Sequence, residues 1–175
     1  MPEQYDSRTI ALHWISAILV IGLWTLGQCI DFFPKGTPRV TARSLHITFG
    51  VLLGIVLIVR LSWRMGGGGV KLSNATSGYL GTIAVVAHYL LYALMVAAVA
   101  LGVWSVWTRG DTLFNLFTVP AFDPSNKQLR HDAVELHELA ANILLALAAF
   151  HAAAALWHHF VRKDGVLRRM LPGLK

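Results

Sequence analysis

One apolar segment near the C-terminus constrains the fold more than any other part of the chain. From Leu139 to Val161 the sequence contains no Asp, Glu, Lys or Arg, and this length is sufficient for a helix to cross a membrane. The segment nevertheless contains His151, and His137 lies just before it. Ionisable side chains are costly inside a bilayer and usually face the interior of a helix bundle, so these histidines are functional candidates.

The spacing of the two histidines indicates where their side chains lie. On a helix, fourteen residues correspond to a rise of roughly 21 Å and return to within about 40° of the starting face. His137 and His151 therefore face the same way at two different depths. Each needs a second ligand from another helix to bind a metal. The pattern thus indicates two metal centres arranged across the membrane.

The composition supports a membrane protein. Charged residues make up 14% of the 175 residues, whereas about a quarter is usual for soluble domains. Apolar segments predict four membrane-spanning helices at approximately residues 10–30, 44–63, 80–108 and 135–161. The uncharged part of the second segment is short, but Arg60 and Arg64 at its end can extend their side chains to the membrane interface, so the segment can still span the membrane. The sequence therefore predicts an all-α, integral membrane four-helix bundle that forms a single domain over residues 1–175.

The basic residues indicate the topology. The net charge is +6, and the cations sit at the ends of spans, which is a sign of membrane orientation and not of nucleic-acid binding. With the N-terminus inside, nine cations face the cytoplasm and six face outwards. We therefore expect both termini in the cytoplasm. The apolar segment 113–122 in the longest outer connection is expected to lie against the membrane or to cap the bundle.

With this topology the histidines form two pairs at matching depths. His13 and His151 lie in the inner half, and His46 and His137 lie near the outer edge. Each pair comes from two different helices and is suited to bind one planar metal macrocycle from both faces. Haem iron accepts two axial histidines, and the absence of a C-x-x-C-H motif predicts non-covalent haem b. We therefore predict two haems b, with Arg60 as a partner of a haem propionate.

The sequence resembles the bacterial cytochrome b561 family over essentially the whole chain. The resemblance rests on these residues: His13-Trp14, Phe32-Phe33-Pro34, His46 with Gly50, His137-Glu138, His151, Trp157-His158-His159 and Lys163-Asp164. It implies a multi-pass dihaem protein of the bacterial inner membrane that acts as a superoxide oxidase. In such an enzyme, superoxide gives its electron to haem on the periplasmic side, and ubiquinone is reduced near the cytoplasmic side.

Two groups of residues are then candidates for the substrate sites. An anionic substrate favours a cationic entrance, and cations lie close to His46 on the outer side. They are Lys35, Arg39 and Arg43. Quinone reduction takes up protons, and histidines near neutrality can relay them. The candidates in the cytoplasmic half are His88, His158 and Lys71. Ordinary packing or anchoring at the interface is the alternative role for each of these residues.

Two other functions remain open at this point. A cytochrome b subunit that passes electrons between a partner hydrogenase or dehydrogenase and the quinone pool would use the same spans and ligands. The short outer loops favour a protein that acts without a partner. A haem-free membrane transporter with histidines as zinc ligands is the second alternative. Zinc prefers tetrahedral clusters, whereas these histidines are spread over two depths.

Overall fold

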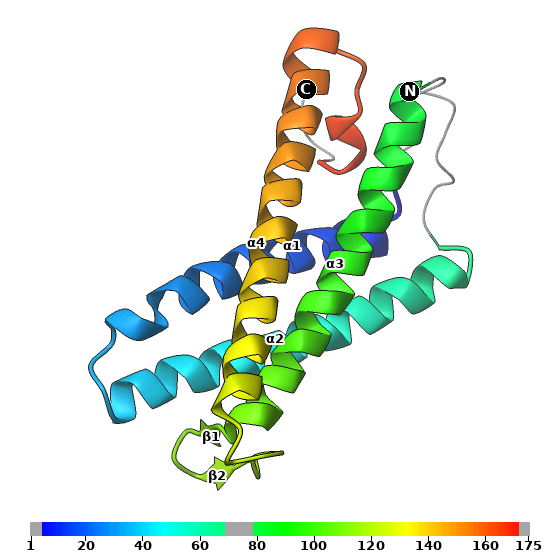
Figure 1. Ribbon diagram of the computed structural model, residues 1–175. Coiled ribbons are helices and arrows are strands. Elements are labelled where there is room, and N and C mark those ends of the chain that lie inside the picture. Colours follow the sequence, from blue (N-terminus) through cyan, green and yellow to red (C-terminus); the bar gives the residue numbers. More distant parts are fainter. Residues whose placement is uncertain (1–4, 69–78, 172–175) are drawn as a thin grey trace.

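Four long helices make up most of the computed structural model, which describes residues 5–68 and 79–171 (Figure 1). They are α1 (Ser7–Cys29), α2 (Thr37–Met65), α3 (Tyr79–Arg109) and α4 (Lys127–Trp157). All four are long and apolar enough to cross a membrane. The predicted all-α fold with four membrane-spanning helices is confirmed.

Two of the helices, α2 and α4, begin well before the starts that the apolar pattern predicts. Helix α2 starts at Thr37, with Pro38 in its first turn. Backbone N–H groups of the first turn have no acceptor within the helix, so proline, which lacks the N–H, is well tolerated there. Helix α4 starts at Lys127, and the side chain of Asn126 accepts a hydrogen bond from the Leu129 N–H. A proline in the first turn of α2 and a side-chain cap on α4 thus favour helix starts in polar residues that lie outside the apolar core of each span.

The helices form two antiparallel hairpins that cross one another (Figure 1). Helices α1 and α2 make the first hairpin, joined by a short 3-10 turn at Ile30–Phe32, and α3 and α4 make the second. Contacts of α2 with α3 and of α1 with α4 connect the hairpins. We call the end that holds Ser7, Met65, Tyr79 and Trp157 the termini end, and the opposite end the β-hairpin end.

A small β-hairpin follows α3. Strand β1 (Thr112–Leu113) pairs antiparallel with β2 (Phe117–Thr118), and Phe114 and Asn115 take positive φ in the turn. Gly110 ends α3 with φ of 69°, and a Cβ there would lie 2.9 Å from the Cβ of Ala121. Only glycine fits this close approach. Phe122 packs on Trp104 and Trp107, so the end of the apolar segment 113–122 lies against α3, whereas Leu116 and Phe117 are exposed.

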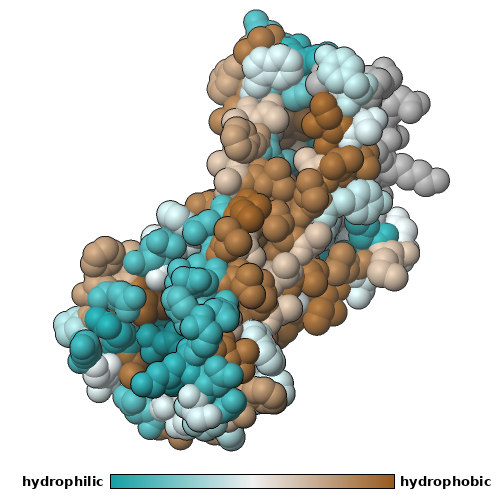
Figure 2. Space-filling model, viewed as in Figure 1, coloured by the Kyte–Doolittle hydropathy of each residue, from teal (hydrophilic) through white to brown (hydrophobic). Residues whose placement is uncertain are grey.

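The outer surface of the helices is apolar, whereas the β-hairpin end is hydrophilic (Figure 2). Large side chains such as Ile18, Ile58 and Phe150 are more than 60% exposed, which suits contact with lipid tails. The core between the hairpins is small and is built around Leu57, Met95, Ala98 and Leu144. Packing in the core leaves the histidines on the facing sides of the helices.

Candidate functional site

The structure brings His46 and His137 together near the β-hairpin end. His46 is on α2 and His137 is on α4, and their ring centroids are 6.1 Å apart. The Nδ1 atom of His137 lies 2.9 Å from the carbonyl oxygen of Ala98 on α3. This hydrogen bond fixes the ring and leaves Nε2 as the nitrogen available for a ligand bond. The two side chains thus form one histidine pair, which we call the outer pair because it lies nearer the β-hairpin end.

Each ring of the outer pair is seated against a glycine of the preceding helix. A Cβ added to Gly102 would lie 3.1 Å from Cε1 of His137, and one added to Gly27 would lie 3.3 Å from Cε1 of His46. Nδ1 of His46 is buried without a well-formed hydrogen bond in the described part of the chain. The absence of side chains at these two positions lets the imidazoles lie against the helix backbones.

A second histidine group lies nearer the termini end. The ring centroids of His13 on α1 and His151 on α4 are 6.2 Å apart. His88 on α3 is a further neighbour, with its ring 5.2 Å from that of His151 and its Nδ1 2.6 Å from the Ala84 carbonyl oxygen. His88, a predicted quinone residue, therefore contacts the inner pair directly.

The separations within both pairs suit a metal macrocycle. A metal–imidazole bond is about 2 Å long and the ring centre lies about 1.1 Å behind the nitrogen, so two axial imidazoles have centres about 6 Å apart. The observed values are 6.1 and 6.2 Å. Among the described residues, no three His, Cys, Asp or Glu side chains are placed to hold a bare metal ion. The residues present therefore fit haem iron better than a tetrahedral zinc site.

An arginine lies beside the inner group. Arg60 on α2 is half-buried, stacks over the ring of Tyr92 at 5.0 Å, and lines a small pocket together with Arg64 and Thr9. In the described residues Arg60 forms no ion pair with a carboxylate. A half-buried guanidinium without a carboxylate is suited to an anionic group of a ligand, such as a haem propionate.

The comparisons with known proteins agree with this arrangement. The family model described as prokaryotic cytochrome b561 matches residues 4–173. The chain belongs to the prokaryotic cytochrome b561 family. Members of this family bind haem b, and the protein is accordingly a membrane electron-transfer protein that crosses the bacterial inner membrane several times.

Individual relatives of this cytochrome b561 family cover nearly the whole chain. A "Probable superoxide oxidase CybB" from Yersinia pestis is 27% identical and is aligned over 98% of both chains. "Cytochrome b561 homolog 2" from Escherichia coli is 31% identical, with 97% of this chain and 92% of the relative covered. "Cytochrome b562" from Cereibacter sphaeroides is 28% identical, over 95% and 94% of the two chains.

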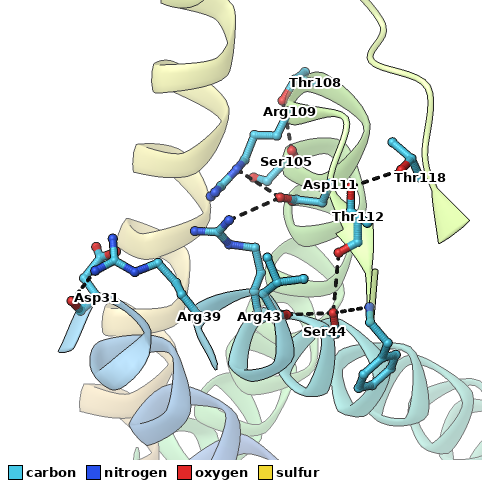
Figure 3. Close-up of polar contacts among 12 residues, drawn as sticks. Asp31, Arg39, Arg43, Ser44, Ser105, Thr108, Arg109, Asp111, Thr112 and Thr118 are labelled. Atoms are coloured by element: carbon cyan, nitrogen blue, oxygen red, sulfur yellow. Dashed lines mark hydrogen bonds and ion pairs between the residues drawn. The ribbon is translucent and has the colours of Figure 1, made fainter. Parts of the chain in front are cut away.

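Two of the three predicted superoxide residues of the cytochrome, Arg39 and Arg43, form ion pairs at the β-hairpin end (Figure 3). Arg39 is 3.3 Å from Asp31 and donates to the backbone carbonyl oxygens of Asp31 and Phe33. Arg43 is 3.6 Å from Asp111, and Arg109 is 3.5 Å from the same carboxylate. Lys35 is exposed and makes no ion pair within the described residues.

Asp111 is the centre of this network. Its side chain is only 9% exposed. Burial raises the pKa of the Asp111 carboxyl, against the lowering effect of Arg109 and Arg43. Ser44 on α2 is fully buried nearby, where its Oγ accepts a hydrogen bond of 2.8 Å from the Phe114 N–H. Together these contacts fix the β-hairpin to α2.

Two further predicted residues concern the termini end. His158 follows the last turn of α4, and its Nδ1 lies 2.5 Å from Oδ2 of Asp164. Lys71 lies outside the described residues. Reasoning from the sequence did not assign a role to Gly27, Gly102, Asp111 or Asp164. For the two glycines, the available signal is their position inside an apolar helix, because a glycine there often marks a close approach of another side chain to the helix backbone.

Proposed function

We propose that this cytochrome is a dihaem b oxidoreductase that oxidises superoxide to dioxygen on the periplasmic side and reduces ubiquinone near the cytoplasmic side. The observation that carries the proposal is the presence of two histidine pairs, His46 with His137 and His13 with His151, near opposite ends of the bundle. The name of the Yersinia pestis relative supports the choice of substrate. The β-hairpin end would face the periplasm, as the distribution of cations suggests.

Each histidine pair would supply both axial ligands of one haem b, and Arg60 would pair with a propionate of the inner haem. Haem, when bound, supplies one-electron redox chemistry. In the overall reaction, two superoxide anions, one ubiquinone and two protons give two dioxygen molecules and one ubiquinol. The protein therefore has to attract an anion at one end and to provide protons at the other.

One part of the β-hairpin end has a local excess of positive charge that suits an anionic substrate. Arg39 pairs with Asp31, and Arg43 and Arg109 share Asp111, while Lys35 makes no ion pair within the described residues. The ion pairs hold the arginines in place, and the excess of positive charge raises the local concentration of superoxide. The candidates for contact with the quinone are His88 and His158 in the half of the bundle toward the termini end, together with Lys71, which lies outside the described residues.

Removal of one ligand of the outer pair tests the proposal. His137→Ala or His46→Ala should leave one haem per chain and abolish reduction by superoxide, because the entry site loses its cofactor. His131→Ala provides a matched control, since this histidine lies on the same helix, 61% exposed, in contact with Glu135. Retention of two haems in either ligand variant would refute the pairing.

A second candidate function is a cytochrome b subunit that passes electrons between a partner hydrogenase or dehydrogenase and the quinone pool. The observation that favours it is a set of exposed apolar side chains near the β-hairpin end, where a periplasmic partner would bind. Phe32 is 86% exposed, Leu116 is 89% exposed and Phe117 is 60% exposed. Co-purification of a redox subunit, together with no reduction by superoxide, would favour this function.

A further inference from the structure

The end of α4 departs from regular α-helical geometry. Residues His158–Arg162 form a π-helical turn, and Lys163 follows with a left-handed φ of 54°. Such turns occur frequently at functional sites. The reversal at Lys163 folds the chain back, so that the side chain of Asp164 contacts the first residue of the turn, His158.

The contact between His158 and Asp164 is well defined. Nδ1 of His158 lies 2.5 Å from Oδ2 of Asp164, and Nε of Arg162 lies 3.6 Å from the same oxygen. The other oxygen, Oδ1, accepts a hydrogen bond of 3.3 Å from the Val166 N–H. Both carboxylate oxygens are thus engaged, which fixes the carboxylate and, through it, the orientation of the imidazole.

The pair lies between the inner histidines and the solvent at the termini end. His158 follows His151 by seven residues, so the two lie on nearly the same side of the helix and about 10 Å apart along it. The side chain of His158 is 15% exposed and that of Asp164 is 27% exposed. His158 is therefore mostly enclosed, while its partner Asp164 reaches water at the termini end.

Asp164 is ionised near neutral pH. Burial raises the pKa of its carboxyl, but the hydrogen bonds from His158 and the Val166 backbone outweigh this effect and hold the pKa below its ordinary value. An ionised Asp164 accepts a hydrogen bond from Nδ1–H of His158. Nε2 of His158 then remains available to a second group.

We propose that Asp164 is a positioning residue for ubiquinone reduction: its carboxylate orients His158 so that Nε2 of the ring donates a proton to a quinone oxygen. This inference rests on the proposed function. The quinone takes up two electrons, supplied by two superoxide anions, and two protons. Nε2 of His158 gives up its proton to the quinone oxygen, the neutral ring keeps Nδ1–H on Asp164, and water at the termini end returns a proton to Nε2.

The test compares Asp164→Asn with Asp164→Glu in the purified, haem-loaded protein. Asparagine retains an acceptor for Nδ1–H but loses the charge, so reoxidation of the reduced haems by ubiquinone should slow about tenfold. This is less than the about 10²–10⁴-fold that general acid–base catalysis contributes, because His158 itself remains. The slowing should appear in kcat and not in KM, with a larger solvent isotope effect. Asp164→Glu should restore most of the rate. Haem content, the affinity for a ubiquinone analogue and the rate of reduction by superoxide should remain unchanged.

Arg162→Gln is the matched control, because it removes a cation beside Asp164 while the contact between His158 and Asp164 remains; it should change the rate less than twofold. A rate for Asp164→Asn within twofold of the parent would overturn the inference, and so would a loss of haem or of analogue affinity that accompanies the slowing. Failure of superoxide to reduce the parent protein would refute the proposed function instead. In that case, reduction of the haems by ubiquinol tests Asp164 in the reverse direction, with the same expected slowing.

Discussion

The close packing of the His137 ring against Gly102 allows a quantitative test of the outer histidine pair. In Gly102→Ala the new Cβ would lie 3.1 Å from Cε1 and 3.4 Å from Nδ1 of the His137 ring. The ring has to move by a few tenths of an ångström, and this movement strains the hydrogen bond of 2.9 Å between Nδ1 and the Ala98 carbonyl oxygen. Overpacking of this kind costs about 1–3 kcal/mol.

This cost converts into a loss of haem affinity. If the strain falls on the ligand-bound geometry, about 1–3 kcal/mol corresponds to an affinity about 5- to 150-fold lower. The assay is titration of haem into membranes produced under haem limitation, with the haem-to-protein ratio and the low-spin electron paramagnetic resonance signals of the two centres as readouts. Only the outer centre should weaken.

Two other glycines provide graded controls. Gly27→Ala brings a Cβ to 3.3 Å from Cε1 of His46, which is less close and should cost less. At Gly22, on the same helix as Gly27, a Cβ meets nothing within 4 Å. Gly22→Ala should therefore bind haem like the parent. Equal haem affinity in the Gly102, Gly27 and Gly22 variants, with unchanged resonance signals, would show that His137 does not bind haem from its position against Gly102.

Three further predictions concern the β-hairpin end. Ser44→Ala leaves the buried Phe114 N–H without its acceptor, at a cost of about 1–3 kcal/mol or about 2–4 °C in melting temperature per kcal/mol; Ser62→Ala on the same helix should melt like the parent. Because the folded-state pKa of Asp111 is raised, the stabilisation from its protonation is complete below pH of about 4 and is lost as the pH rises. Thermal melts should therefore show Asp111→Asn gaining stability relative to the parent between pH 4 and 7, and a relative loss would contradict the sign. Lys35→Glu should slow haem reduction by superoxide severalfold at low salt and reduce its salt dependence, whereas Arg168→Glu at the termini end should not.

The four helices and the grouping of the histidines follow from local patterns in the sequence. An apolar segment of sufficient length has one stable form in a membrane, the helix. Helical periodicity placed His137 and His151 on one side, and the expected depths suggested His46 and His13 as their neighbours. These inferences needed only the spacing along each helix and the order of the spans.

Contacts between distant parts of the chain were not predictable in this way. The β-hairpin depends on Ser44, which is 70 residues from Phe114. The sharing of Asp111 by Arg43 and Arg109 depends on how α2 lies against the end of α3. The contact between His158 and Asp164 requires a left-handed residue at Lys163, a conformation that lysine rarely adopts. The apolar pattern contains no information on any of these geometries.

The most direct test of the proposed function is to mix the purified, oxidised protein with a source of superoxide and to follow the haem absorption bands with and without ubiquinone. We predict rapid haem reduction that superoxide dismutase abolishes and that ubiquinone reverses. A protein that ubiquinol or a chemical reductant reduces, but superoxide does not, would contradict the proposal and indicate a cytochrome that receives electrons from a partner.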